Sequence, residues 1–278
     1  MTDIALTANP VTPTLDATPA GAFVAMLGRD LRVLLKTLPV FLLRTVMQPV
    51  LLMFVFTYVF PRIGQAVGGG GAAAAAFSTL LVSGVVGLSM IFQGIQSVAL
   101  PLVQEFGFTR EIEDRVLAPL PVWAVGAQKI ASGALQALVA AIVVFPFGYL
   151  IPTTSVHLRF DWPVLLTVTP LACVLCASLG LAVGCSFDSR QVPLIFTIIV
   201  LPITFLGAVY YPWSSLTPIG WLKVGVLVNP LVYISEGLRA GLTNVHHMPL
   251  VAVYGAMLGY TALLGALGIR GFKKRVLL

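Results

Sequence analysis

Long apolar segments separated by short polar ones dominate the sequence, and six of the apolar segments are long enough to cross a membrane. A membrane-spanning helix needs about 20 mostly apolar residues, and the segments lack the alternating pattern of outer-membrane strands. The pattern therefore predicts an all-α integral membrane protein with six transmembrane helices in one domain, residues 20–278. The predicted spans cover approximately residues 39–60, 73–103, 122–150, 164–187, 192–211 and 250–269.

The N-terminal region divides into two parts. Residues 1–19 are rich in Thr, Pro and Ala and have no hydrophobic period, which predicts a disordered cytoplasmic tail. Residues 20–37 place Phe, Met and Leu side chains on one helical face, with Arg29, Arg32 and Lys36 interspersed. This spacing predicts an amphipathic helix at the cytoplasmic membrane surface, with an extension of the first span as the alternative.

A segment with many charges of both signs, residues 104–121, interrupts the apolar pattern between the second and third predicted spans. A loop that only connects two spans does not need this density of charge. We therefore predict that the segment faces the cytoplasm and docks onto a soluble partner. The predicted docking residues are Glu105, Phe106, Arg110, Glu111, Glu113, Asp114 and Arg115.

The region between the fifth and sixth predicted spans, residues 212–245, is rich in Pro and Gly at first and amphipathic later. Its Trp and Tyr side chains are typical of the lipid headgroup level, which predicts interfacial or partly re-entrant helices on the outer side. Glu236 and Arg239 are three residues apart and can pair on one helix face. A shallow salt bridge at the outer interface is favoured over a functional charge inside the membrane.

Composition and charge support the membrane interpretation and set the orientation. The chain is 58% hydrophobic and 9% charged, whereas a soluble domain carries about 25% charged residues. The net charge of +6 lies mainly beside the spans, which argues against nucleic-acid binding. The segments predicted to be cytoplasmic contain more Lys and Arg than the segments predicted to be external. We therefore expect a multi-pass protein of the bacterial inner membrane with both termini in the cytoplasm. The predicted cytoplasmic cations are Arg29, Arg32, Lys36, Arg110, Arg115, Arg190, Arg270, Lys273, Lys274 and Arg275, against Arg62, Arg159, Lys223 and Arg239 outside.

The sequence lacks the motifs of a self-contained motor or enzyme. It contains no G-x-x-x-x-G-K-[ST] phosphate loop, no H-E-x-x-H and no G-x-S-x-G. It also lacks the buried Asp, Glu and Lys cluster that an ion-driven pump needs. The spans are therefore expected to be passive, with no cofactor or metal on this chain. Cys173, Cys176 and Cys185 share one span and are interpreted as packing residues.

Small and polar residues within the spans predict helix contacts. Gln93 and Gln96 are expected to bond to a neighbouring helix, with a place on a substrate path as the alternative. Arg44 and Lys129 lie near the inner ends of their spans, where their long side chains can snorkel. The small residues are Ser83, Gly84, Gly87, Ser89 and Gly94 in the second span, Gly180 and Gly184 in the fourth, and Gly255 and Gly259 in the last.

Three stretches in order carry a family likeness. They are FTREIEDRVLAPLPVWAVGAQKI at residues 108–130, PITFLGAVYYPWSSL at 202–216 and NPLVYISEGLR at 229–239. Together they resemble the membrane subunit of bacterial ABC-2 type transporters, a group that includes daunorubicin-type drug exporters, nodulation-factor exporters and polysaccharide exporters. The likeness covers nearly the whole chain after about residue 20. Asp114 stands where the family commonly has Gly, and Leu206 where it often has Ser.

The resemblance implies a pair of permeases, formed by this chain with a second copy or a homologous permease, and two cytoplasmic ABC ATPase subunits that bind ATP and Mg. It implies that residues 105–117 are the coupling helix, residues 20–37 the interface helix and residues 212–245 an outer gate. The gate residues would be Trp213, Trp221, Tyr233, Glu236 and Arg239. Substrate would pass between the two copies, along the first, second and fifth spans, beside Phe54, Tyr58, Gln93, Gln96 and Phe205.

We expect the exported substrate to be a hydrophobic small molecule, drug or lipid-like, because the sequence shows no long polar lining. A role in antibiotic resistance would accompany a drug substrate. A lipid-linked polysaccharide or glycolipid is the alternative substrate, and an ion-coupled carrier or channel is an alternative function. A membrane-embedded lipid or glycan enzyme is a further alternative, with His157, Asp161, Glu236, His246 and His247 as its outer-face residues.

Overall fold

The computed structural model describes residues 18–65, 67, 69, 71–107, 120–187 and 191–277, and these form helices and connecting turns without a β-strand. The predicted tail lies almost entirely outside them. The main helices are α1 (Pro19–Lys36), α2 (Leu38–Phe54), α3 (Phe60–Arg62), α4 (Gly71–Gly107), α6 (Val122–Leu150), α7 (Trp162–Ser186), α8 (Val192–Phe205), α9 (Gly220–Gly225), α10 (Pro230–Leu242) and α11 (Leu250–Leu277). A π-helical turn, η1 (Val55–Val59), joins α2 to α3, and two 3-10 turns, η2 (Trp213–Leu216) and η3 (Val226–Val228), flank α9.

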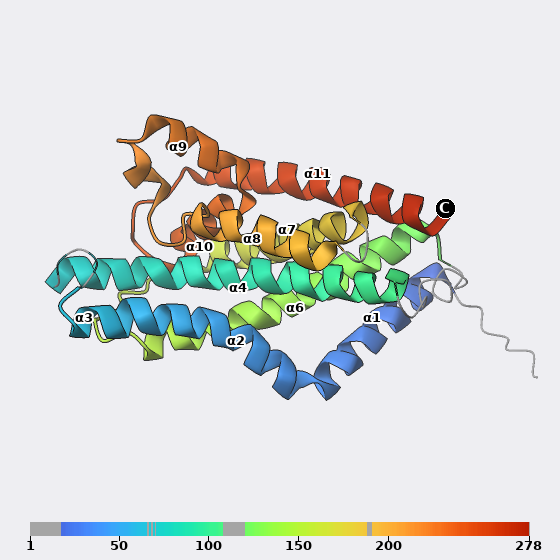
Figure 1. The fold of residues 1–278 in the computed structure, drawn as a ribbon, viewed down its shortest axis with the longest axis horizontal. Helices are drawn as coiled ribbons and strands as arrows, with labels where there is room; N and C mark the ends of the chain where they lie inside the picture. Colours follow the sequence, from blue (N-terminus) through green and yellow to red (C-terminus); the bar gives the residue numbers. More distant parts are fainter. Residues whose placement is uncertain are drawn as a thin grey trace, which may run out of the picture.

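Five helices of the described chain are long and apolar enough to cross a membrane, and they run side by side (Figure 1). They are Leu38–Arg62, Gly71–Gly107, Val122–Leu150, Trp162–Ser186 and Leu250–Val276. The all-helical membrane fold is thus confirmed. The C-terminus and α1 lie at the same end of the molecule (Figure 1), so the chain returns along the bundle to the end where it began.

The predicted span at residues 192–211 is shorter than expected, so the structure does not confirm the count of six. Helix α8 has 14 residues, or about 21 Å, against about 30 Å for the hydrocarbon core of a bilayer. Pro202 lies inside the helix, and the chain turns after Phe205, where Ala208 takes a positive φ of 53°. A proline removes a helix hydrogen bond, and the chain beyond α8 folds into the protein instead of continuing the helix.

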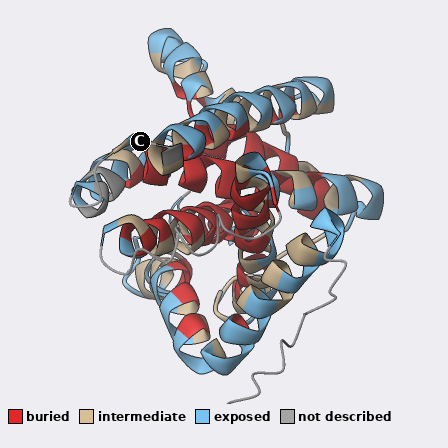
Figure 2. Cartoon of the chain, turned by 90° about the vertical axis from the view of Figure 1, so that its right-hand side faces the viewer, coloured by how far each residue is buried: buried red, intermediate tan, exposed pale blue. Residues whose placement is uncertain are grey.

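Helix α4 lies at the centre of the bundle and packs against α6, α7 and α10. Its 37 residues extend about 55 Å, and most of its middle is buried (Figure 2). The backbones of α4 and α7 meet closely: a Cβ added to Gly180 would lie 2.7 Å from the carbonyl oxygen of Gly94. Within lipid, such close van der Waals contact replaces the hydrophobic drive that packs helices in water.

The predicted roles of the small residues are therefore confirmed for α4 and α7 but not for α11. A Cβ on Gly84 would lie 2.3 Å from the carbonyl oxygen of Val209, and Cys176 packs directly against Gly94. Gly255 and Gly259, by contrast, have nothing within 4 Å of an added Cβ. These two glycines lie on a face that packs against no described part of this chain, so their predicted packing role stays a prediction.

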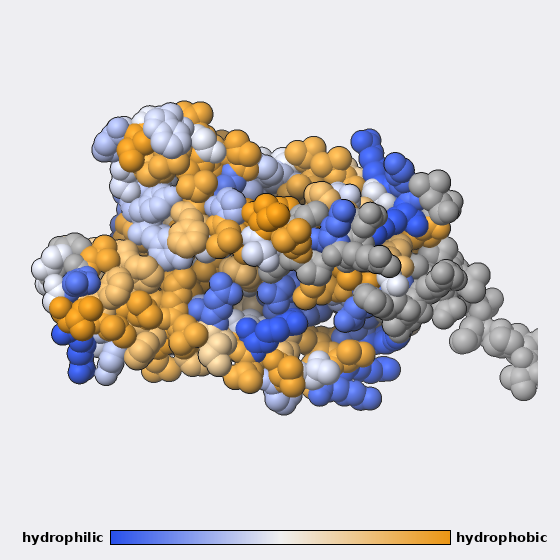
Figure 3. Space-filling view, in the orientation of Figure 1, coloured by the Kyte–Doolittle hydropathy of each residue, from blue (hydrophilic) through white to orange (hydrophobic). Residues whose placement is uncertain are grey.

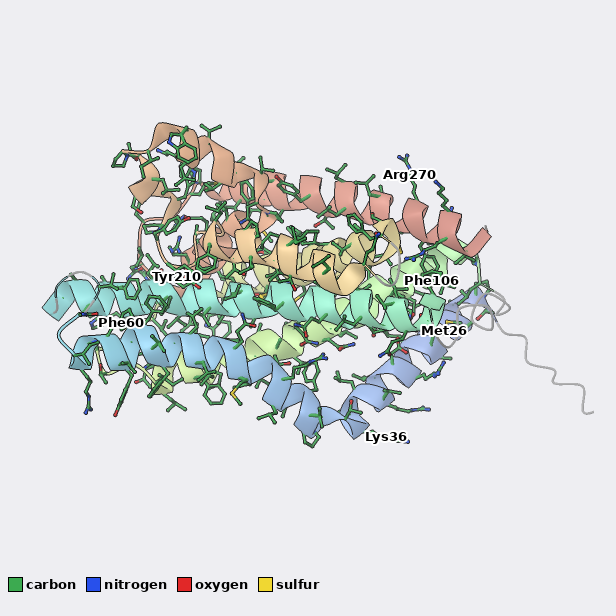
Figure 4. All side chains as sticks on the ribbon, in the orientation of Figure 1. Met26, Lys36, Phe60, Phe106, Tyr210 and Arg270 are labelled. Carbon is green, nitrogen blue, oxygen red and sulfur yellow. The ribbon has the colours of Figure 1, made fainter. Side chains whose placement is uncertain are left out.

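Helix α1 is amphipathic, as predicted, and its N-terminus is capped by the Thr18 hydroxyl. Its apolar residues Phe23 and Met26 pack against a small core cluster that includes Leu102 of α4 and Phe272 of α11. Met26 and Phe106 both lie at this end of the bundle (Figure 4). The docking of its apolar face fixes α1 beside the ends of the long helices.

A bulky side chain at the α4–α7 contact should disrupt the fold. We expect Gly180→Leu to lower the free energy of unfolding by about 3 kcal/mol, because backbone lies where its side chain would go. Thermal unfolding of the detergent-purified chain measures this loss. Gly259→Leu is the matched control and should unfold like the wild type, since its position is open. Equal stability of the two variants would contradict the packing assignment.

Candidate functional site

A buried ion pair joins the two helices that flank the predicted docking segment. Lys129, near the start of α6, donates to Glu105, in the last turn of α4, with Nζ and Oε1 2.5 Å apart. Both residues are only 5% exposed. The pair therefore fixes the end of α4 to the beginning of α6, where the chain enters and leaves the segment.

This arrangement corrects two predictions. Lys129 does not snorkel, because its ammonium group is enclosed and needs the carboxylate of Glu105 as a partner. Glu105 turns its carboxylate toward α6, so its predicted role as an exposed docking residue does not fit this structure. The remaining charged docking residues, Arg110, Glu111, Glu113, Asp114 and Arg115, lie outside the described residues.

Phe106 connects the end of α4 to the C-terminal helix. Its ring packs edge-on against Phe272, with centroids 5.9 Å apart, and the Arg275 guanidinium lies 4.9 Å from its centroid. Arg275 also donates to the carbonyl oxygen of Gly184 at 2.8 Å. The ends of α4, α7 and α11 thus form one connected group beside the predicted docking segment.

The predicted interface-helix cations Arg29, Arg32 and Lys36 are exposed on α1. Lys36 lies at the corner between α1 and α2 (Figure 4). On the other side of α1, Asp30 accepts a hydrogen bond of 2.8 Å from the Gln128 amide of α6. Helix α1 therefore contacts the bundle through one face and presents cations on another.

A second buried ion pair organises the opposite region of the chain. Glu236 and Arg239 pair within α10, as predicted, but they are 1% and 0% exposed. Helix α10 is enclosed by protein, because α4, α7 and α11 pack against it and bury nearly all of its residues. The predicted position of the pair at the outer interface stays a prediction, since burial by other helices does not fix depth in a bilayer. Helix α9 lies at the periphery of the bundle at this end, away from α2 and α4 (Figure 1).

The Glu236 carboxylate links α10 to the chain segments around Trp213 and Met248. Its Oε1 accepts a hydrogen bond from the Trp213 amide at 2.8 Å, and its Oε2 accepts one from the Met248 amide at 2.8 Å. Arg239 donates to the carbonyl oxygen of Ala208 at 2.9 Å. Burial lowers the pKa of the Arg239 guanidinium, while the Glu236 carboxylate opposes this shift. We call these residues the outer clasp: Ala208, Trp213, Glu236, Arg239 and Met248.

The clasp is named outer because the sequence analysis predicts this end to lie outside the cell, and of the other two predicted gate residues Tyr233 bonds near it whereas Trp221 does not. The Trp213 indole donates to the carbonyl oxygen of Lys223 at 3.0 Å, and the Tyr233 hydroxyl donates to that of Leu227 at 3.0 Å. Trp221 is 78% exposed on α9, apart from the clasp. The region is therefore a buried hydrogen-bonded core with one exposed aromatic helix.

Asn229 is a connecting residue that the sequence analysis did not single out. Its side chain accepts from the Leu231 amide at 2.9 Å and so caps α10, and it donates to the carbonyl oxygen of Ile203 in α8 at 2.8 Å. The Asn-Pro pair before an apolar run was a readable signal for a helix start. The bond to α8 could not be read from the sequence.

The predicted substrate-path residues separate into two groups. Phe54 and Tyr58 stack with centroids 4.9 Å apart, and Phe205 is 61% exposed at the end of α8. Gln93 instead accepts a hydrogen bond from Thr45 at 3.0 Å, which confirms the predicted contact with a neighbouring helix. Gln96 lines a cavity of 520 Å³ between α1, α2, α4 and α6. The structure therefore does not gather these five residues into one path.

The lining of this cavity is mixed, and the greater part of its surface is apolar. Charged residues of α1, α2, α4 and α6 and several amides contribute the polar part. The sequence analysis did not anticipate this gathering, because each of the four helices has few such residues. The expectation of a hydrophobic substrate stays a prediction.

Removing the carboxylate of the outer clasp should cost more than removing its guanidinium. Glu236→Ala leaves a buried cation and two backbone amides without their acceptor, whereas Arg239→Ala leaves the carboxylate with both amide donors. We expect Glu236→Ala to be the less stable variant by about 2 kcal/mol in thermal unfolding. Equal losses, or a larger loss for Arg239→Ala, would show that the carboxylate is not the organising group.

Comparisons of the sequence with known proteins identify the family of this chain. The chain is 28% identical over 221 residues to the inner membrane transport permease YadH of Escherichia coli strain K12, covering 77% of this chain and 81% of that protein. The same protein of Shigella flexneri gives the same identity and coverage. The family model described as ABC-2 type transporter matches residues 21–243, which include α1, the bundle through α8 and the outer clasp up to Arg239. This chain therefore belongs to the ABC-2 type transporter family and forms a membrane transporter subunit.

Proposed function

We propose that this chain is the permease subunit of an ATP-driven exporter in a bacterial inner membrane. In this proposal it pairs with a second copy or a homologous permease, and two separate cytoplasmic ABC ATPase subunits bind ATP and Mg. The absence of a phosphate-loop motif from the sequence supports an external motor. The relatives named as inner membrane transport permeases support the location and the transport role.

The observation that carries the proposal is the buried pair of Glu105 and Lys129. A partner that moves the charged segment between α4 and α6 must pass that motion into the membrane domain. The ion pair ties both flanking helices together, so the two helices would move as one body. Phe106 and Arg275 extend this connection to α11 and α7.

The proposed orientation places this end of the bundle in the cytoplasm. Helix α1, the end of α4 and the basic C-terminal residues all lie there (Figure 4). Cytoplasmic loops of membrane proteins carry an excess of Lys and Arg. Export would then move substrate from this end toward the outer clasp.

The mixed polar and apolar lining of the cavity narrows the proposed substrate class. A purely hydrophobic molecule would gain nothing from charged residues and amides, and would have to displace water from them. Helix α2 nevertheless presents exposed apolar side chains beside the cavity, including Val40 and Leu43. We therefore propose a lipid-like amphiphile as the substrate, with a lipid-linked polysaccharide or glycolipid as the alternative.

Glu236 is not available for the alternative function as a membrane-embedded enzyme. Glu236 accepts two backbone amide donors and pairs with Arg239, so its carboxylate is fully engaged in holding structure. Asp161, His246 and His247 border an outer cavity, but the described residues include no group of three or more His, Cys, Asp or Glu suited to a metal. We do not propose an enzymatic role.

Reversing the charges of the docking segment should separate the permease from its motor. The test variant combines Glu111→Lys, Glu113→Lys and Arg115→Glu in the complex expressed with its ATPase. We expect co-purification of the ATPase, and substrate-stimulated ATP hydrolysis, to fall roughly tenfold, because opposed charges across an interface repel. Arg159→Glu, an exposed reversal in another loop, is the control. Unchanged coupling in the triple variant would contradict docking through this segment.

Breaking the Glu105–Lys129 pair should uncouple transport from hydrolysis even where the ATPase still binds. Lys129→Met leaves a carboxylate buried without its partner, at a cost of about 3 kcal/mol. We expect this variant to lose substrate-stimulated hydrolysis, while the exchanged pair Glu105→Lys with Lys129→Glu regains at least part of it. Hydrolysis by the reconstituted complex is the measurement. A fully coupled Lys129→Met variant would rule out the proposed mechanical role of the pair.

A further inference from the structure

The cavity between α1, α2, α4 and α6 has the size and the lining of a ligand site. Its volume of 520 Å³ lies within the range of about 300–1,000 Å³ typical of small-molecule pockets. A smaller pocket adjoins it along α2 and shares Arg44 and Gln96 with it. Figure 3 shows hydrophilic surface between the regions of α2 and α4, on a face that is otherwise mostly hydrophobic.

The charges that line the cavity do not cancel. Three cations, Arg29, Arg44 and Lys129, face two acids, Asp30 and Glu105. Lys129 pairs with Glu105, and Asp30 accepts a hydrogen bond from Gln128. Among the described residues of the lining, cations thus outnumber acids by one.

Arg44 is the cation of this lining that the structure leaves available. In the part of the chain that is described, neither Arg44 nor Gln96 makes a hydrogen bond or an ion pair. The adjoining pocket adds the amides of Gln48 and Gln93, and Gln93 already bonds to Thr45 and Gln136. The Arg44 guanidinium and the amides of Gln48 and Gln96 thus remain beside this pocket. Together these groups offer several N–H donors to a single anion.

The position of Arg44 in the membrane domain makes an anionic partner favourable. Arg44 lies within the Leu38–Arg62 helix that is long enough to cross a bilayer, about 9 Å along the axis from Leu38. Its neighbours on α2, Val40, Leu43 and Met47, are 72%, 65% and 51% exposed, as expected of a face toward lipid. A charged side chain inside a span is costly unless it meets an opposite charge or a polar surface.

We propose that this cavity binds the phosphate headgroup of a membrane amphiphile. Arg44 would pair with the phosphate, Gln96 and Gln48 would donate hydrogen bonds to it, and the apolar chains would lie along the exposed face of α2. Arginine suits this role because its planar fork matches two phosphate oxygens. The inference rests on the proposed function and makes it specific, because it names the headgroup chemistry of the proposed amphiphile.

A lipid-attached phosphate fits the site better than a free anion. The apolar lining contributed by Val33, Val40 and Phe41 would gain nothing from an inorganic ion. The same lining, next to exposed apolar side chains of α2, suits the beginning of an acyl chain. A polar headgroup with an apolar tail thus matches both parts of the surface.

The test uses the full-length chain in a maltoside detergent, which has no phosphate, without ATPase, nucleotide or added phospholipid. A photo-activatable phosphatidic acid probe is added, and its covalent yield on the protein is measured. We expect Arg44→Gln to lower the yield roughly tenfold, since a hydrogen-bonded charge pair is lost. Arg44→Lys should retain part of the yield, because it keeps the charge. Lys274→Gln, which removes an exposed cation outside the cavity, should label like the wild type.

Three further arms separate the sources of binding. A diacylglycerol probe without phosphate should label poorly, and millimolar inorganic phosphate should not displace the lipid probe. Equal labelling by diacylglycerol, displacement by inorganic phosphate, or equal labelling of Arg44→Gln and wild type would each overturn the proposal. Cross-linking of two copies through Arg44→Cys that excludes the probe would assign the surface to a subunit contact and overturn it as well.

A failure of this inference can be told apart from a failure of the proposed permease function. Arg44 is exposed, so its replacement should leave thermal unfolding unchanged, and this measurement accompanies each variant. Loss of lipid binding together with intact ATPase coupling would refute the headgroup site alone. Loss of ATPase co-purification together with intact lipid binding would refute the docking proposal alone.

Discussion

The close contact between α4 and α7 is the interaction on which the rest of this membrane domain depends. Lipid tails are as apolar as the side chains they would replace, so helix association within a bilayer must come from packing and hydrogen bonds. Gly94 and Gly180 let the two backbones meet, and Gly84 lets the chain after α8 reach α4. With α4 fixed in the centre, the helices around it bury its surface and acquire defined positions.

Two buried ion pairs then connect the ends of the helices to the segments outside them. Glu105 and Lys129 join α4 to α6 at one end, and Glu236 and Arg239 join α10 to the chain around α8 and α11 at the other. A buried ion pair adds little net stability, but breaking it is costly. Such pairs therefore specify one arrangement of the helices. Between them the bundle can transmit a displacement, since its core is close-packed.

The domain combines this rigid packing with a cavity that contains charged and amide groups. Thr45, Gln93 and Gln136 form a chain of hydrogen bonds across α2, α4 and α6. The cavity lined by Gln96 and Arg44 lies beside this chain. A transporter subunit needs both properties. Rigid helix packing transmits motion through the domain, and a polar surface can bind a polar group of the substrate. In this chain both are built on the same helix, α4.

The sequence by itself determined the membrane class, the helix limits near residues 122–150, the amphipathic α1 and the family likeness. These follow from local hydrophobic pattern, length and motif order, which do not need neighbours. The tertiary structure decided that Glu236 and Lys129 are enclosed, that Gly255 and Gly259 pack against no described part of the chain, that α8 stops at Phe205, and that single amides from several helices line one cavity. These features depend on which helix lies beside which, and a pattern along one chain does not contain that information.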